Sequence, residues 1–92
     1  MSIVVRFSPA SLTAQKYDET MPRIEDAGEW PPDGLDYHVC LGSEDNLRVS
    51  EIWDSREQFE AFGKRLMPIL AEAGIELSAE PEVLEVHNIL RR

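Results

Sequence analysis

The chain has 92 residues, of which 42% are apolar and 29% charged, so it is long enough for one small domain that buries roughly two thirds of its surface on folding. Its 18 acidic and 9 basic side chains give a net charge of −9, which repels phosphate backbones and anionic lipid head groups, so we expect no nucleic-acid or membrane partner. No apolar run approaches the ~20 residues of a membrane span, the N-terminus does not resemble a signal peptide, and we therefore expect a cytoplasmic protein.

The first third of the chain predicts a strand, a helix and a loop. Residues 3–7 are short and β-branched, which is typical of a strand. Ser11 is the expected cap of a helix that Gly28 ends. Apolar residues recur at helical spacing between these two points, at Leu12, Tyr17, Met21, Ile24 and Ala27. Pro22 interrupts the pattern and lacks a backbone N–H, so we expect a kink or an early end there. The two prolines and two glycines of residues 28–34 predict an irregular loop.

The middle of the chain predicts a β-hairpin. Residues 37–41 and 47–53 both alternate between apolar and polar side chains, and residues 42–46 carry the composition of a turn.

The last third of the chain predicts a helix and a strand. Ser55 and Gln58 stand three residues apart before a long apolar face, which is the signature of a capping box. Gly74 is the expected end of this helix, and Pro68 interrupts it. Residues 83–90 predict the final strand.

This βαββαβ order predicts one α+β domain. Right-handed crossovers favour a single antiparallel sheet with strand order 4-1-3-2 and both helices on one face. Alternation assigns one set of side chains to the helix side: Ile3, Val5, Phe7, Tyr37, Val39, Leu41, Leu47, Val49, Trp53, Leu84, Val86 and Leu90. Glu51 falls within this set and predicts either a bulge or a buried, partnered carboxylate.

The opposite set mixes apolar and ionisable side chains: Val4, Arg6, Ser8, His38, Cys40, Arg48, Ser50, Ile52, Val83, Glu85, His87 and Ile89. Such a face suits neither water nor a closed core. We therefore expect two copies to pack through it as a symmetric homodimer and to enclose a cavity lined by the Arg and His side chains.

Several stretches of the chain together resemble the small dimeric α+β-barrel proteins grouped with antibiotic-biosynthesis monooxygenases. They are residues 47–55, Phe59, Phe62, Pro68, Pro81 and residues 86–88, with further similarity at 17–18 and 32–34. The resemblance implies one ferredoxin-like domain over residues 1–92 that forms a dimeric barrel. Related barrels include cofactor-free quinol oxygenases, haem-degrading enzymes, isomerases and ligand-sensing domains, so the fold leaves the reaction open.

One branch of these relatives is disfavoured. Haem-degrading members carry an Asn on the first strand, a Trp nine residues after the position of Trp53, and a His ten residues further on. Here no Asn precedes Asn46, and the other two positions hold Phe62 and Glu72. We therefore expect no cofactor.

His87 and Arg6 are the candidate catalytic residues. A neutral imidazole at position 87 can take a proton from a phenolic or enolic substrate, as cofactor-free oxygenation requires, and the alternative is a structural His at the dimer seam. Arg6 can hold a developing oxyanion, and the alternative is an ion pair with Glu85.

Trp30, His38, Arg48, Ser50 and Glu85 are the candidate ligand-binding residues. Trp30 lies in the irregular loop, where it either covers the cavity mouth or docks on the partner subunit. Trp53, Phe59 and Phe62 are expected to be core packing.

No metal site and no nucleophilic cysteine are expected. The single Cys40 excludes an intramolecular disulfide and leaves a Cys-based zinc site short of ligands. His38 and His87 belong to opposite edge strands of the expected sheet, about 14 Å apart, which is too far for one metal ion.

Three functions remain open. The first is a cofactor-independent monooxygenase acting on a hydrophobic, ionisable ring compound. The second is a non-catalytic ligand-binding or sensing module, and the third is a structural dimerisation protein.

Overall fold

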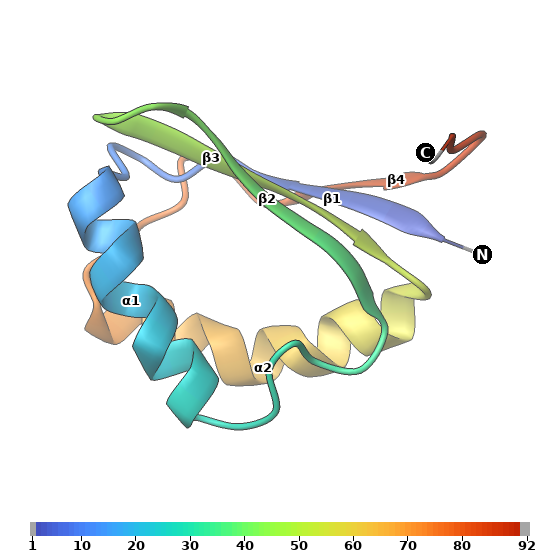
Figure 1. Cartoon of the computed structure of the whole chain (residues 1–92), viewed down its shortest axis with the longest axis horizontal. Coiled ribbons are helices and arrows are strands. Elements are labelled where there is room, and N and C mark those ends of the chain that lie inside the picture. The colour runs from blue at the N-terminus through green and yellow to red at the C-terminus, as the bar shows by residue number, and fades with distance from the viewer. Residues whose placement is uncertain (1, 91–92) are drawn as a thin grey trace.

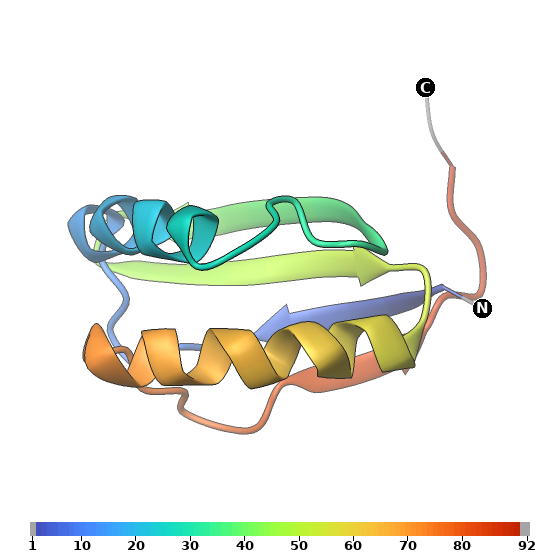
Figure 2. The same cartoon turned by 90° about the horizontal axis from the view of Figure 1, so that it is seen from below.

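A computed structural model describes residues 2–90 as a four-stranded sheet covered on one face by two helices (Figure 1). The elements in chain order are β1 (Ile3–Phe7), α1 (Ala14–Asp26), β2 (Leu35–Ser43), β3 (Asn46–Trp53), α2 (Arg56–Glu72) and β4 (Glu82–Glu85). All neighbouring strands are antiparallel and their order is β2-β3-β1-β4, so the predicted fold class and strand order are confirmed. Figure 2 shows α1 and α2 lying side by side in front of the sheet. Neither of these helices is long and apolar enough to cross a membrane.

The ends of α2 are built as the sequence predicts. The Ser55 hydroxyl accepts a hydrogen bond from the backbone N–H of Gln58 at 3.2 Å and so satisfies one of the unpaired donors of the first turn. At the other end Gly74 takes a φ of +75°, a conformation that favours glycine. The N–H groups of Gly74 and Ile75 then bond back to the carbonyls of Ala71 and Leu70, which is a Schellman motif.

Helix α1 begins two residues later than expected and is not cut short by its proline. Thr13, and not Ser11, is the N-cap, and its side chain accepts from the N–H of Lys16. Ser11 has a φ of +56° in the turn before the helix. Pro22 lies inside α1 as Pro68 lies inside α2, and both helices continue past them. Both prolines face solvent, where the carbonyl that each leaves unpaired can bond water.

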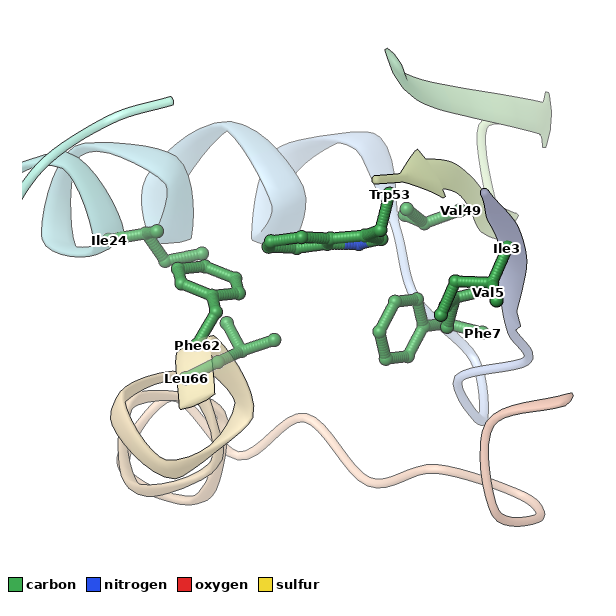
Figure 3. Packing of buried hydrophobic residues seen from close by; sticks show 8 residues of the cluster. All are labelled: Ile3, Val5, Phe7, Ile24, Val49, Trp53, Phe62 and Leu66. Carbon is green, nitrogen blue, oxygen red and sulfur yellow. The ribbon is translucent and has the colours of Figure 1, made fainter. Parts of the chain in front are cut away.

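The hydrophobic core lies between the sheet and the helices and is centred on Trp53. Trp53 and Val5 are fully buried, and Phe62 and Leu66 reach them from α2 (Figure 3). The Trp53 and Phe62 ring centroids are 5.5 Å apart, and Phe59 packs on Trp53 at 5.8 Å. These aromatic side chains are core packing, as the sequence predicts.

The side chains of β2 face the opposite way from the prediction. The two-residue turn between Ser43 and Asn46 sets a register in which His38 is opposite Glu51 and Cys40 is opposite Val49. Residues directly opposite in an antiparallel pair share a face, so His38 and Cys40 point toward the helices. The expectation that Tyr37, Val39 and Leu41 line the core is therefore wrong, and these three side chains are 40–49% exposed on the other face.

An irregularity at the start of β2 returns its first residue to the core. Leu35 is opposite Trp53, but Tyr37 is opposite Ile52, so one extra residue is inserted between the two pairs. Because of this bulge, Leu35 and His38 both face the helices although they are three residues apart.

The last strand is shorter than expected, and its side chains face the opposite way from the prediction. Val83 is opposite Val5 and packs against the core, whereas Leu84 is 48% exposed on the open face. The backbone N–H of Val86 bonds Ser2, and residues after it run past the described start of β1, so His87 and Ile89 lie outside the strand. The predicted strand over residues 83–90 is thus wrong at its C-terminal end.

Replacing Ser55 with Ala should lower the free energy of unfolding by about 1 kcal/mol, because the first turn of α2 loses its capping acceptor. Urea denaturation followed by circular dichroism measures the change. Ser43→Ala, at the exposed end of β2, is the matched control and should stay within about 0.5 kcal/mol of the wild type. Equal effects of the two substitutions would show that the cap does not stabilise the fold.

Candidate functional site

A mainly apolar cavity of about 70 Å³ lies between the two helices and the sheet. Side chains from α1, α2, β1, β3 and the segment after α2 form its apolar wall. Its lining also includes Tyr17, Thr20, Trp30, His38 and Glu51, which are the side chains that carry polar groups. A largely apolar hollow with a few converging polar groups is the usual form of a small-molecule site.

A chain of hydrogen bonds runs through the polar side of this cavity. The Trp53 indole N–H donates to Glu51 Oε1 at 3.0 Å, and His38 Nδ1 lies 2.5 Å from Glu51 Oε2. The Tyr17 hydroxyl lies 2.7 Å from His38 Nε2. The chain joins α1, β2 and β3, which are three separate elements of the fold.

The carboxylate end of the chain fixes the orientation of the imidazole. Glu51 is only 3% exposed, and an ionised carboxylate can only accept hydrogen bonds. With Glu51 ionised, His38 donates from Nδ1, which leaves Nε2 to accept from the Tyr17 hydroxyl. A carboxylate that orients one imidazole nitrogen while the other faces a hydroxyl is the arrangement of a general base. The sequence predicts either a bulge at Glu51 or a buried, partnered carboxylate, and the structure has the buried, partnered carboxylate.

Tyr17 and Cys40 are both held in their neutral forms. Burial raises the pKa of Tyr17 to about 12, with further contributions from Cys40, Glu51 and Asp18. Burial also raises the pKa of the Cys40 thiol, and the Asp18 carboxylate raises it further. A thiol held neutral in this way is a poor nucleophile, so the chemistry of the site rests on His38.

Trp30 forms part of the cavity wall. Its ring meets the His38 ring edge-on with centroids 5.6 Å apart, and it packs on Phe62 at 6.1 Å. The two roles expected from sequence concerned a cavity on the open face and stay predictions, whereas these contacts place Trp30 in the wall of the cavity on the helix side.

The structure divides the sequence-predicted site residues between the two faces of the sheet. Trp30 and His38 line the cavity on the helix side. Arg6, Arg48 and Ser50 come together on the open face, where they line a separate polar pocket of about 210 Å³ with Glu82. His38 was expected on that open face beside the arginines, and this placement is wrong because the hairpin register turns it inward.

The end of β4 does not reach the open-face pocket. Glu85 is opposite Ile3, three residues along β1 from Arg6, so the expected Arg6–Glu85 ion pair is not formed and Glu82 takes the position opposite Arg6. His87 is exposed beyond the strand, and it is not brought next to Arg6. Their catalytic roles, inferred for a pocket on this face, remain predictions.

Sequence reasoning did not assign Tyr17 and Glu51 to the site. A usable signal was present for Glu51, because a carboxylate in the buried phase of a strand needs a partner, and a two-residue turn between Ser43 and Asn46 places His38 directly across from it. No signal in the sequence connects Tyr17 to His38, since the contact depends on how α1 docks on the sheet.

Within residues 2–90, no cluster of three or more His, Cys, Asp or Glu side chains is arranged to hold a metal ion.

No protein-family model and no curated protein matches the sequence. Among solved structures, SnoaB from Streptomyces nogalater, a cofactor-independent oxygenase, is similar over 99% of this chain and 96% of its own, with 18% identity and a TM-score of 0.59. The protein YJCS is similar over 95% of this chain and 100% of its own, with 13% identity and a TM-score of 0.64. A Chloroflexus aurantiacus protein proposed to be an antibiotic biosynthesis monooxygenase is 18% identical over 96% of this chain and 94% of its own, with a TM-score of 0.55.

The chain shares the fold of these solved structures. The ferredoxin-like α+β fold that the resemblance implies is therefore confirmed, and the dimeric barrel stays a prediction.

The Tyr17 phenol should titrate with a midpoint near pH 12 in a Tyr37→Phe background, in which Tyr17 is the only tyrosine. Absorbance at 295 nm follows the ionisation. The free energy of unfolding should fall as the pH rises from about 10 to about 12, because the unfolded phenol releases its proton near pH 10 and the folded one retains it. A midpoint near 10 in the folded protein would contradict the burial of this hydroxyl.

Proposed function

We propose that this protein binds a hydrophobic, ionisable ring compound in the cavity between sheet and helices and oxygenates it without a cofactor. The observation that carries the proposal is the His38 imidazole, held between Glu51 and Tyr17 at the polar side of an otherwise apolar hollow. Fold similarity to SnoaB, a cofactor-independent oxygenase, supports this choice of reaction.

The reaction begins with loss of a substrate proton. Tyr17 lines the cavity and already donates to His38, so its oxygen accepts the proton of the substrate as its own proton moves to Nε2. Glu51 then stabilises the imidazolium that forms. Because the phenol has a pKa of about 12, it relays the proton and does not persist as a phenolate.

Molecular oxygen is the second reactant. The carbanion of an activated ring CH2 group reacts with O2, and the CH2 becomes a carbonyl while the second oxygen atom leaves as water. The two electron pairs needed come from the two C–H bonds of the substrate, so no flavin, haem or metal is required. The apolar lining suits both an aromatic ring and O2.

A non-catalytic ligand-binding or sensing module is the alternative, and it would use the same cavity. It predicts saturable binding of a ring compound without consumption of O2. A purely structural role predicts that no small molecule shifts the melting temperature, so a thermal-shift screen of quinols and aromatic polyketides separates these cases.

His38→Ala should reduce turnover of any substrate found in that screen by about 10²-fold or more, the usual contribution of a general base. Oxygen uptake measures the rate, and circular dichroism checks that the variant folds. His87→Ala is the matched comparison, because His87 is exposed outside the sheet. If the reaction takes place in the open-face pocket instead, with His87 as base and Arg6 holding the oxyanion, His87→Ala should lose turnover and His38→Ala should keep it. Loss of turnover in His87→Ala alone would therefore reject the role of His38.

We further propose that the active form is a homodimer packed through the open face of the sheet. Tyr37, Val39, Leu41 and Leu84 are 40–49% exposed on this face, which neither helix covers (Figure 1). Apolar side chains gathered on one face of so small a domain favour an interface over contact with water. A second copy supplies the same surface, and a two-fold axis makes such a patch self-complementary.

Light scattering at low micromolar concentration should give twice the chain mass of 10.5 kDa. Val39→Asp should shift the protein to a monomer, because it places a charge in the proposed interface. Met67→Asp is the control, since Met67 is 47% exposed on α2 against 49% for Val39 and lies on the helix side. A monomeric wild type, or equal dissociation in both variants, would reject the interface.

A further inference from the structure

We propose that Trp30 determines the size of the ring that the cavity admits, and that Arg65 is the positioning residue that holds Trp30 in the wall. This inference rests on the proposed function only in that it concerns the same cavity. Its starting point is a mismatch of size, since the hollow of about 70 Å³ is smaller than the ~150 Å³ that holds a benzene molecule in an apolar cavity. A ring compound therefore needs one wall of the cavity to move.

Trp30 is the part of the wall that is best placed to move. The apolar lining from α1, α2 and the strands is fixed by helical or sheet hydrogen bonds. The lining residues outside these elements, Pro9, Leu12, Ile75 and Leu77, are held by a β-bridge or by backbone hydrogen bonds. Trp30 belongs to the irregular segment between α1 and β2. Its indole is held through ring contacts with His38 and Phe62. Displacing it would widen the cavity beside the imidazole that we propose as the base.

Arg65 fastens this segment to α2 on one side of Trp30. Its guanidinium donates to the backbone carbonyl of Glu29 at 2.6 Å and lies 5.0 Å from the centre of the Phe62 ring. The same ring packs on Trp30, so one arginine holds both the backbone before the indole and the side chain behind it.

Gly28 provides the space in which the guanidinium lies. A Cβ at this position would come within 2.7 Å of Arg65 Nη1, so even an alanine would push the guanidinium away. Arg65 Nε is buried without a hydrogen-bond partner, which leaves part of the cost of burying this group unrecovered. The fastening is therefore specific in its contacts but not strong.

Gln58 fastens the segment on the other side of Trp30. Its side-chain amide donates to Asp33 at 3.3 Å, and it packs against the chain at Gly34. The indole thus lies between two attachments to the same helix. Loss of the Arg65 contact leaves the Asp33 end attached and frees the part of the segment that carries Trp30.

Fluorescence quenching by acrylamide measures the position of Trp30 directly. Trp53, the other tryptophan, is fully buried, so Trp30 is the accessible one. Arg65→Met should raise the quenching constant at least twofold, and Arg65→Lys, which keeps a donor, should lie between it and the wild type. Gly28→Ala should act as Arg65→Met does although Arg65 is present. Arg56→Met is the control on the same helix, because Arg56 is exposed and pairs with Glu60, and it should leave quenching unchanged.

Calorimetric titration with phenol and 1-naphthol measures the size of ring admitted. Trp30→Ala should tighten 1-naphthol binding at least tenfold relative to phenol, and Arg65→Met should shift the same ratio in the same direction. Trp30→Phe, which keeps a ring, should lie closer to the wild type and serves if the Ala variant does not fold. A 1-naphthol to phenol ratio unchanged in these variants, or quenching unchanged in Arg65→Met and Gly28→Ala, would overturn the proposal.

These binding measurements do not depend on turnover. If the ratio shifts while no variant consumes O2, the proposed oxygenase function fails and the role of Trp30 stands. If wild-type turnover is found and the ring-size preference does not respond to Trp30 or Arg65, the function stands and this inference fails.

Discussion

The fold depends on hydrogen-bond donors for one carboxylate, that of Glu51, which lies on the buried face of β3. Glu51 is almost fully enclosed, and an ionised group there without donors would cost several kcal/mol. Trp53 and His38 supply the donors, and Tyr17 extends the chain of hydrogen bonds from the sheet to α1. Removing one member leaves a polar atom of its neighbour in the chain without that partner in the interior. The same interaction that the fold must keep therefore also presents an oriented imidazole to the cavity.

Elements with strong local signals could be predicted from the sequence. The strands β1 and β3, the Ser55 cap and the Gly74 stop each follow from a few adjacent residues, and the strand order follows from the handedness of crossovers. The orientation of β2 could not be predicted from alternation alone, because its more apolar set, Tyr37, Val39 and Leu41, faces outward. The end of β4 was missed because it is set by where the partner strand β1 begins, which is a tertiary constraint.

The candidate site was predicted only in parts. The sequence predicts Trp30 and His38 as ligand-binding residues of an open-face cavity, and the structure places both in the wall of the cavity on the helix side. Alternation predicts the cavity on the open face, because it predicts a filled core on the helix side. Whether two layers pack without a gap is decided by side-chain volumes across the interface, and no single element carries that information. The arginines of the open face were grouped correctly, because Arg6 and Arg48 belong to neighbouring strands in the right phase.

The short hairpin connection between β2 and β3 has a consequence for how this sequence can change over evolution. Two residues separate Ser43 from Asn46, and that count pairs His38 with Glu51 far down the ladder. An added residue that no bulge absorbs, unlike the one between Leu35 and Tyr37, would slide the strands by one position and send the imidazole to the outer surface. Substitutions at Glu44 or Asp45 leave the count intact. Related sequences that keep the imidazole–carboxylate pair should therefore vary freely in the composition of this turn and hardly at all in its length.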